Sequence, residues 1–415
     1  MAERRRIYGW GAILGLALGI AGAAPPARAA DDIRIGMVSP MSGPTAKFGQ
    51  SEKNAVDLAV EEINAAGGIK ALGGAKLVVS YGDSRGDGDT GATETERLIT
   101  KEKVIAVIGA FQSGVSMPAS AVAERYHVPW LNFGTADGLA TRGFKYFFRP
   151  HANDAVKAKA LTDAIAYFSG KTGTKLTTAA IMAENTDWGK SVSVHQQSGL
   201  ETAGTKVALL ENYPFASPDL TSMIVKAKAT KPDLVVIDSY LGDALLIART
   251  MSEQDLRPVV FAAGGGGSVQ PDFEKGAGPL AEGVLSAVAW DAGIGYSVPW
   301  IAEENAKHVK RFGVSFTEDS ASYYQNAWII ADALERVKGA PTAEALRDAL
   351  VATKITDPNR HAMLIPYKQI AFDAAGENPD AAAFVVQWQQ GKLVLLFPTT
   401  LADPAAKVVW PYPAP

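Results

Sequence analysis

The sequence predicts an α/β protein made of two successive halves in which strands and helices alternate. Three observations indicate this class. A strand–loop–helix pattern spans residues 33–68, the alternation restarts after Arg149-Pro150, and the expected strands at 104–108 and 234–237 are apolar at every position. Continuous apolar strands are typical of parallel sheets that are covered on both faces. A chain of 415 residues is also long enough for two domains of ordinary size.

The first half begins with the clearest local pattern. Residues 33–38 are an apolar run that predicts a strand, and a polar loop containing Gly and Pro follows it. In the next segment Val56, Ala59, Val60 and Ile63 recur at the spacing of one buried helix face, and Gly67-Gly68 predicts the end of that helix. Further strands are predicted at 76–81, 104–108 and 128–133, with helices at 90–100 and 115–125.

The second half repeats the alternation and then changes character. Strands are predicted at 177–182, 206–213, 233–238, 258–262 and 283–288, and helices near 153–168, 188–202, 218–229 and 241–253. The run 298–350 is mainly helical, with one buried stripe of Tyr324, Ala327, Trp328 and Ala331. Two β segments, 384–388 and 393–397, flank a turn and predict a hairpin-like pair. The Pro/Ala-rich tail after Pro398 is expected to wrap a surface.

The first residues predict an export signal. Arg4, Arg5 and Arg6 form a basic segment, residues 7–24 are mostly apolar, and Ala27-Arg28-Ala29 fits a small-x-small cleavage site. A membrane anchor is the alternative, but a stable span needs about twenty strongly apolar residues, and this run is short and rich in Gly and Ala. We therefore expect residues 1–29 to be a signal peptide cleaved near Ala29. The Arg run leaves both general and twin-arginine export open.

Composition excludes several function classes. The chain has no cysteine, so it forms no disulfide, thiolate metal site or thiol nucleophile, and it has no lipid-bearing cysteine. The net charge is −4 and the basic residues are scattered, which argues against a nucleic-acid partner. The five histidines show no metal spacing, and no G-x-S-x-G nucleophile motif occurs. We expect neither an enzyme nor a bound metal or cofactor.

The segment 33–68 closely resembles the start of mature periplasmic solute-binding proteins of the branched-chain amino acid (Leu/Ile/Val) type. These proteins are the soluble receptors of bacterial ABC importers. The resemblance covers essentially the whole chain after the signal and implies the type I periplasmic-binding fold, with two doubly wound lobes joined by a three-segment hinge. It implies that lobe 1 comprises residues 30–151 plus 289–363, that lobe 2 comprises residues 152–288 plus 364–400, and that residues 401–415 form a C-terminal tail. The chain is expected to cross between the lobes near residues 150–153, 286–291 and 360–368.

Two loops of the first half carry the resemblance to a binding site. Residues 109–120 resemble the family's first carboxylate-binding loop, with Ser113 at the position of the ligand-contacting serine and Gln112 before it. Helix N-terminal N–H groups and a hydroxyl can hold an anion without a buried cation. Residues 131–144 resemble the second loop, where Thr135 supplies a hydroxyl and Phe133 and Gly134 supply backbone groups. Alternatively Ser113 and Thr135 are helix caps, a role compatible with ligand contact.

Aromatic residues are expected to face these loops. Trp188, in residues 184–191, and Tyr240, in residues 237–244, stand where the family places rings over the ligand, and Phe48 stands where it places an aromatic in the first lobe. The alternative is that these rings belong to the core. Their positions just after strands favour the cleft.

One segment departs from the family. In amino-acid-binding members, a loop after a second-lobe strand supplies an acid that binds the ligand's ammonium group, but here that place holds Gly264–Gly267. A desolvated ammonium without a carboxylate partner is costly. Either another acid substitutes or the ligand has no α-ammonium, and the aromatic walls then favour a flat apolar acid such as an aromatic carboxylate. The candidate acids are Asp238, Asp137 and Asp187, or Asp272 and Glu274 if the register is shifted.

The resemblance implies a monomeric periplasmic receptor that closes by a hinge and delivers its ligand to permease subunits in the inner membrane. The expected ligand is a small aromatic or branched-chain carboxylate. An amino-acid receptor of the same transporter class is one alternative, and a sensory receptor that feeds a signalling partner is another.

Overall fold

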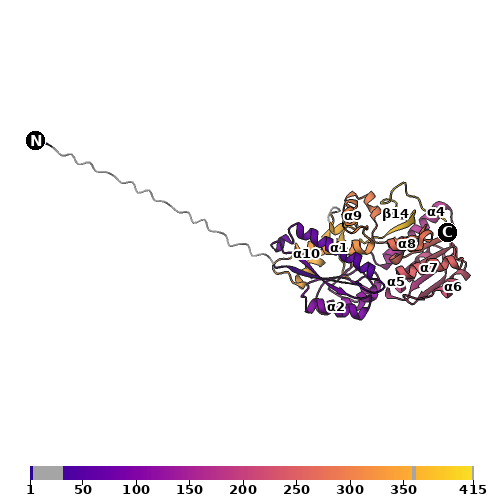
Figure 1. Ribbon diagram of the computed structural model, residues 1–415, viewed down its shortest axis with the longest axis horizontal. Coiled ribbons are helices and arrows are strands. Elements are labelled where there is room, and N and C mark those ends of the chain that lie inside the picture. Colours follow the sequence, from indigo (N-terminus) through magenta and orange to yellow (C-terminus); the bar gives the residue numbers. More distant parts are fainter. Residues whose placement is uncertain (3–30, 358–360, 414–415) are drawn as a thin grey trace.

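The computed structural model describes residues 1–2, 31–357 and 361–413. The predicted signal peptide and its cleavage site fall almost wholly on residues 3–30 and so lie outside the described chain. The described residues form two α/β lobes that lie side by side (Figure 1), each with one main sheet between layers of helices. None of the helices in this part of the chain combines the length and the apolar character needed to cross a membrane.

The first lobe is built on a five-stranded parallel sheet in the order β2-β1-β3-β4-β5. The strands are β1 (Ile33–Ser39), β2 (Leu77–Asp83), β3 (Val107–Gly109), β4 (Trp130–Leu131) and β5 (Phe147–Phe148). The strand order reverses between β1 and β3, and ligands of open α/β sheets bind outside the carboxyl ends of the strands at such a point. The loop that leads from β3 into the next helix starts there.

Helices cover both faces of this sheet because the strand side chains alternate between two cores. Ile35 and Met37 of β1 face the core shared with α1 (Ala46–Ala65) and α10 (Glu318–Leu334). Val38 faces the opposite core, which is shared with α2 (Gly88–Thr100) and α3 (Ser113–Arg125). Helix α10 comes from a late part of the chain, so this lobe is discontinuous in sequence (Figure 1).

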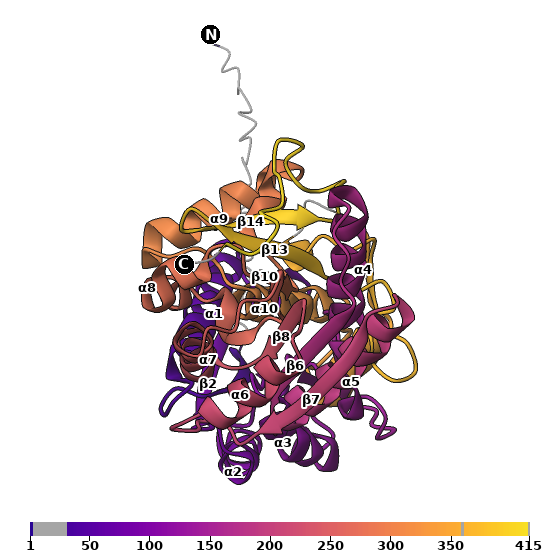
Figure 2. The ribbon, with the colours of Figure 1, turned by 90° about the vertical axis from the view of Figure 1, so that its right-hand side faces the viewer.

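The second lobe is built on a seven-stranded sheet in the order β14-β13-β10-β9-β8-β6-β7 (Figure 2). Its parallel strands are β6 (Thr178–Glu184), β7 (Lys206–Tyr213), β8 (Leu234–Asp238), β9 (Val260–Ala263) and β10 (Leu285–Val288). The late strand β13 (Phe384–Gln389) pairs antiparallel with β10, and β14 (Lys392–Phe397) pairs antiparallel with β13 at the edge of the sheet. They form the predicted hairpin.

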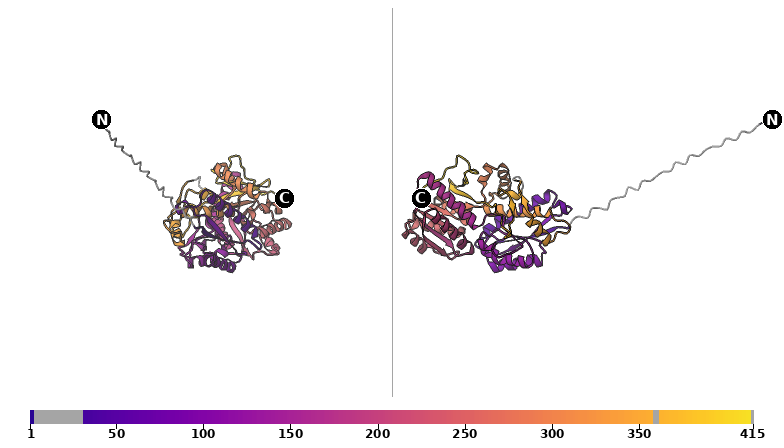
Figure 3. Two further views of the ribbon diagram at one scale, coloured as in Figure 1. Left: turned by 60° about the vertical axis from the view of Figure 1, so that its left-hand side comes forward. Right: turned by 180° about the vertical axis from the view of Figure 1, so that it is seen from behind.

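Helices also cover the second sheet on both faces, as the view from behind shows (Figure 3). One face carries α4 (Asp154–Thr172) and α5 (Asp187–Thr202), and the other carries α6 (Thr221–Ala229), α7 (Leu241–Glu253) and α8 (Pro271–Ala277). The tail returns to this lobe, where the backbone N–H of Tyr412 donates to the carbonyl of Val259 at 2.7 Å.

The remaining elements of the described chain lie in both lobes and in the segments between them. They are α9 (Pro299–Phe312), α11 (Ala343–Val351), the antiparallel pair β11 (Lys354–Ile355) and β12 (Ile370–Ala371), and six 3-10 turns: η1 (Lys70–Leu72), η2 (Asp137–Leu139), η3 (Gly266–Val269), η4 (Gly278–Ala281), η5 (Ala292–Tyr296) and η6 (His361–Met363).

Several sequence-based predictions need correction. The strands predicted at 104–108 and 128–133 are paired over only three and two residues, because apolar burial extends beyond the hydrogen-bonded ladder. Trp328, predicted in the buried stripe of α10, is only half-buried and stacks on His361 with ring centroids 4.4 Å apart. Strand β5 and helix α8 were not predicted, since both are too short to show a period.

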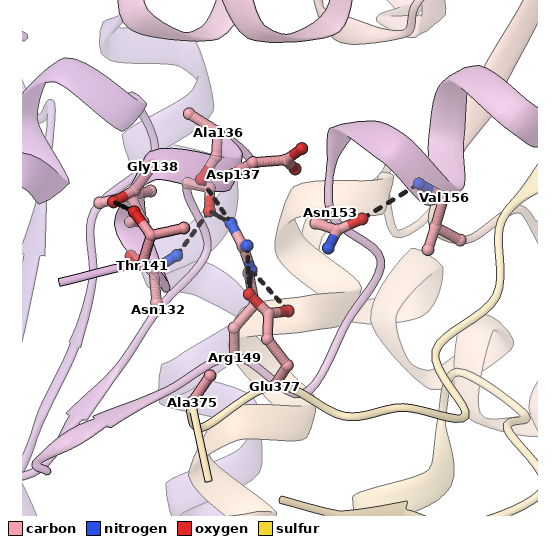
Figure 4. A network of polar contacts seen from close by, with 12 residues as sticks. Asn132, Ala136, Asp137, Gly138, Thr141, Arg149, Asn153, Val156, Ala375 and Glu377 are labelled. Atoms are coloured by element: carbon pink, nitrogen blue, oxygen red, sulfur yellow. Dashed lines mark hydrogen bonds and ion pairs between the residues drawn. The ribbon is translucent and has the colours of Figure 1, made fainter. Parts of the chain in front are cut away.

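A buried arginine ties three distant segments together (Figure 4). The side chain of Arg149 is fully buried just after β5, and its Nη1 donates to the carbonyls of Gly134 and Ala136 at 2.9 and 3.0 Å. Its Nε faces both carboxylate oxygens of Glu377 at 3.1 Å. The arginine therefore holds the Thr135 loop and the late segment around Glu377 at the first crossing between the lobes.

The late segment reaches Arg149 only because it carries a glycine. The backbone N–H of Arg149 donates to the carbonyl of Gly376 at 2.7 Å. Gly376 has a φ of +78°, and a Cβ there would lie 1.9 Å from the carbonyl oxygen of Phe147. A side chain at this position would therefore push the segment away from β5.

We predict that Arg149→Met lowers the free energy of unfolding by about 3–5 kcal/mol, because it leaves a largely buried carboxylate and two carbonyls without a donor. Urea unfolding measures this loss. Arg149→Lys should recover only part of it, since the single nitrogen of a lysine cannot reach the carbonyls and the carboxylate together as the spaced nitrogens of a planar guanidinium do. The matched control is Arg257→Met, whose arginine pairs with the exposed Asp255. An equal loss in both Met variants would contradict the prediction.

Candidate functional site

A small pocket lies between the two lobes, with a volume of about 30 Å³. Its lining combines hydroxyls, aromatic rings and one charge pair, contributed by Phe111, Ser113, Phe133, Thr135 and Glu318 from the first lobe and Lys157, Trp188, Tyr240 and Gly266 from the second. A cavity of this size has room for about two water molecules. This space is too small for an organic ligand in the conformation described.

Ser113 opens helix α3 at the carboxyl end of β3. Its Oγ accepts the backbone N–H of Ala136 at 3.1 Å, so the hydroxyl hydrogen remains available to an acceptor in the pocket. The residue before it, Gln112, is the N-cap and makes no side-chain cap bond; its Nε2 faces the hydroxyl of Thr45 at 3.3 Å. Gln112 thus supports the loop from behind and does not line the pocket. Ser113 is not a helix cap, contrary to the alternative drawn from sequence.

The Thr135 loop also lies against the pocket. The N–H groups of Phe133 and Gly134 donate to the carbonyls of Gly109 and Ala110 at 3.3 and 3.1 Å, so these backbone donors are used within the protein. Phe133 contributes its ring to the pocket and Thr135 its hydroxyl. Thr135 does not cap the following turn either, since the residue at its N-terminus is Ala136.

The rings form a continuous aromatic chain across the two lobes. Trp188 and Tyr240 stack with centroids 5.0 Å apart, and Tyr240 lies 5.4 Å from Phe111 of the facing lobe. Phe111 in turn stacks on Phe48 at 4.1 Å and on Phe133 at 5.7 Å. Phe48 therefore supports Phe111 and does not line the pocket itself. Phe111 was missed by the sequence analysis, although its place between β3 and Ser113 could have indicated it.

The charge pair was also missed. The ammonium of Lys157 in α4 lies 2.9 and 3.2 Å from the two carboxylate oxygens of Glu318 at the start of α10, and both side chains are almost fully buried. Glu318 also accepts the backbone N–H of Ala289 at 2.8 Å. The signal for Lys157 was its register: it shares the buried face of the predicted helix with Ala158 and Leu161.

The glycine run after β9 lies against this pair. A Cβ on Gly265 would be 2.8 Å from Nζ of Lys157 and 3.0 Å from a carboxylate oxygen of Glu318. Gly266 has a φ of +65°, and a Cβ there would lie 2.7 Å from the ring of Trp188. The missing side chains leave the space that the charge pair and the indole occupy.

The acids named as substitutes lie elsewhere, and none of them is among the pocket-lining residues of the described chain. Asp238 is buried and accepts from Nε2 of Gln196 at 2.8 Å. Asp137 pairs with His195 across the two lobes, and Asp272 pairs with Lys47 in the same way. Asp187 stands opposite Gly114, and Glu274 stands near Gly391. The acid that lines the pocket is Glu318.

Two buried aspartates near the pocket have raised pKa values. Burial raises the pKa of Asp154 to about 6, although hydrogen bonds from the hydroxyls of Thr135 and Ser191 partly offset this rise. Burial raises the pKa of Asp238 to about 7, against the hydrogen bond from Gln196, which lowers it.

One further group of potential metal ligands lies on the far side of the first lobe. Glu62, Glu304 and His361 bring three ligand atoms within 4.8 Å of one another. Lys307 already pairs with both glutamates, at 3.5 and 2.7 Å, and the hydroxyl of Tyr324 contacts all three residues. These contacts satisfy the group without an ion, and we interpret it as a structural network.

We predict that wild-type stability falls as pH rises from about 4 to about 7, in part through Asp238. Its pKa is raised from 3.8 to about 7 in the folded state, so the native protein binds a proton that the unfolded chain has lost, and the unfolding free energy decreases over this window. Asp238→Asn stays neutral, and its stability relative to wild type should therefore be higher at pH 8 than at pH 5. Urea unfolding at both values measures this. The exposed Asp255→Asn is the control, and an equal Asp238→Asn difference at both values would contradict the prediction.

Comparisons with known proteins agree with this architecture. A family model described as a periplasmic binding protein matches residues 32–392. The curated Leu/Ile/Val-binding protein homolog 7 of Brucella suis is 33% identical over 397 residues, covering 94% of this chain and 96% of the relative. Homolog 8 of Brucella abortus is 30% identical over 399 residues, with the same coverage.

Solved structures share the fold. A leucine-binding protein of Thermotoga maritima matches with a TM-score of 0.76 at 21% identity, covering 88% of this chain and 97% of the other. A branched-chain amino acid transporter substrate-binding protein of Streptococcus pneumoniae matches with a TM-score of 0.73 at 23% identity, and the match covers 87% of this chain and 97% of the other. A solute-binding protein of R. palustris matches with a TM-score of 0.75 at 18% identity, and the match covers 88% of this chain and 95% of the other. The expected type I fold is confirmed, and the family consists of receptors and not enzymes. The chain belongs to the periplasmic binding protein family of ABC transporter substrate-binding proteins.

Proposed function

We propose that this protein is the solute receptor of an ABC importer for a small carboxylate with an aromatic or branched apolar body. The observation that carries the proposal is the composition of the pocket between the lobes. It combines two hydroxyls at one end with four aromatic rings, and its charges are already paired with each other.

The polar end of the pocket suits a carboxylate. The first N–H groups of α3 have no partner within the helix and carry partial positive charge. The hydroxyl of Ser113 can donate beside them, and Thr135 follows from the next loop. Hydrogen bonds to a charged acceptor contribute about 1.5–3 kcal/mol each, which is enough to anchor a small anion.

The apolar end suits a ring or a branched chain. Trp188, Tyr240, Phe111 and Phe133 line it, and all four are nearly buried. Removing apolar area from water contributes about 25 cal/mol per Å². The rings come from both lobes, so the ligand's apolar body gains its full contacts only after closure.

Two structural neighbours, one solved with an aromatic acid and one with an amino acid, support a carboxylate ligand. The R. palustris protein was solved in complex with benzoate and the S. pneumoniae protein with isoleucine. Both compounds carry a carboxylate. Glu318 is already paired with Lys157, which favours a ligand acid without an amine. An amino acid is the second candidate, because the carboxylate of Glu318 lines the pocket where it could bind an ammonium.

We further propose hinge closure between the two lobes, with the bounds expected from the sequence except at the third crossing. The pairs Lys47–Asp272 and Asp137–His195 bridge the lobes and support a closed state. The pairing of β12 with β11, and of Glu377 with Arg149, supports placing the third crossing later than the sequence indicated, at 379–383.

The remaining parts of the proposal follow from the sequence. We propose export through the signal peptide 1–29, action in the periplasm as a monomer, and delivery to permease subunits in the inner membrane. No observation in the described structure favours the sensory alternative over transport.

A thermal-shift screen tests the ligand class. Benzoate, other aromatic acids and branched-chain acids should stabilise the protein more than leucine, isoleucine or valine does. At a concentration one hundred times the dissociation constant the gain is about 2.7 kcal/mol, which such a screen detects. Stabilising compounds should also reduce the radius of gyration in small-angle scattering. Strong stabilisation by leucine with an inert 4-methylpentanoate would identify an amino-acid receptor instead.

We predict that replacing Ser113 and Thr135 together with Ala weakens binding of the best compound by at least about a hundredfold, the loss of two bonds to a charged group. Both residues are nearly buried, at 2% and 8% exposure. A stability loss of about 1 kcal/mol is therefore expected, because Ala136 loses its acceptor. Calorimetric titration measures the affinity, with Thr172→Ala/Thr174→Ala, whose exposed hydroxyls lie outside the pocket lining, as the control pair. Unchanged affinity in the Ser113/Thr135 variant would remove this subsite.

A further inference from the structure

The charged residues in the lining of the pocket are Lys157 and Glu318, and they come from different lobes. Lys157 lies in the first turn of α4, directly after the first crossing, and Glu318 is the first residue of α10. Side-chain exposures of 4% and 6% show that water hardly reaches either charge. Such a pair is strongly coupled, since the removal of one partner leaves the other buried without a counter-ion.

Glu318 has all the features of an ammonium-binding acid. Its carboxylate accepts from the backbone of Ala289 at 2.8 Å and faces the N–H of Gly266 at 3.4 Å, so its position is fixed on both sides. The helix N-terminus of α10 favours its negative charge. The oxygen that faces Gly266 also lies 3.2 Å from Nζ of Lys157.

The glycine run explains how a lysine can reach this carboxylate. A Cβ on Gly265 would lie within 3.0 Å of both Nζ of Lys157 and the carboxylate of Glu318. Gly265 also has a φ of +101°, which disfavours other residues. The absence of side chains here lets the ammonium of Lys157 sit beside the pocket.

From this geometry we infer that Lys157 is a specificity-determining residue, whose ammonium occupies the place beside Glu318 that the α-ammonium of an amino acid would need. The inference rests on the proposed function and deepens it. A ligand carboxylate held at Ser113 and Thr135 has the lysine charge as a favourable neighbour. An α-ammonium one carbon away would meet a like charge and an acid that is already neutralised. The receptor therefore selects acids without an amine through a cation of its own.

Matched ligand pairs test this inference by calorimetric titration: 4-methylpentanoate with leucine, and 3-phenylpropanoate with phenylalanine. Wild type should bind each acid at least about tenfold more tightly than its amino acid, a difference of about 1.4 kcal/mol. Lys157→Met should lower this preference at least tenfold, because Glu318 is then free to receive the ligand's ammonium. Glu318→Gln should keep the preference, since the repelling lysine remains.

The control for the helix is Lys159→Met, whose lysine is exposed and pairs with Asp163 at 2.5 Å outside the pocket. It should leave the preference unchanged. Circular dichroism and the melting temperature establish that each variant is folded. If Lys157→Met does not fold, Lys157→Met/Glu318→Gln removes both charges, and it should bind acid and amino acid with a smaller difference than wild type.

A folded Lys157→Met or double variant that keeps the wild-type preference would overturn the inference, and so would a wild type that binds the amino acids more tightly. Failure of the proposed function gives a different result, in which wild type binds no member of either pair. In that case a gain of leucine binding in Lys157→Met would still support the role of Lys157, and the absence of any gain would refute it.

Discussion

The rest of the site depends on one constraint, the full satisfaction of the buried guanidinium of Arg149. Its donors fix the carbonyls on either side of Thr135, and its partner Glu377 belongs to the segment that leads into β13. The backbone N–H of Ala136 then donates to the hydroxyl of Ser113, so the two carboxylate-binding loops are linked through this arginine. The chain can cross between the lobes at residue 150 and still hold the binding loops because the buried guanidinium has partners in both the Thr135 loop and the late segment.

Charge is arranged differently on the two sides of the cleft. Ser113 and the start of α3 offer partial positive charge without a formal cation, while the opposite side holds several buried acids and a single pocket-lining lysine. Asp154 and Asp238 avoid part of the desolvation cost by retaining protons. Glu318 offsets the cost of desolvating its charge by pairing with the ammonium of Lys157. The charge pair thus keeps the pocket lining near neutrality, while the raised aspartate pKa values reduce the negative charge of the surrounding residues.

Much of this site could be predicted from sequence, because many of its residues belong to local strand–loop–helix patterns. Ser113, Thr135, Trp188 and Tyr240 each follow a strand within a few residues, so a strand–loop–helix pattern is enough to place them at one edge of a sheet. Lys157 and Glu318 are 161 residues apart, and nothing local relates them. Their meeting depends on how the two lobes are placed relative to each other, because Lys157 belongs to one lobe and Glu318 to the other. Phe48 follows the predicted strand but is not among the pocket-lining residues; its ring packs behind them, on Phe111 and on the edge of Tyr240.

The late strands β13 and β14 have a consequence for biosynthesis. Strand β10 ends at Val288, yet its antiparallel neighbour β13 begins only at Phe384, after the chain has returned to the first lobe to form α10 and α11. A growing chain that has just completed β10 therefore carries an open sheet edge, and an open edge is prone to pairing with other chains. The second lobe can close only when the C-terminal hairpin has been made, so neither lobe can finish folding as an independent N-terminal unit.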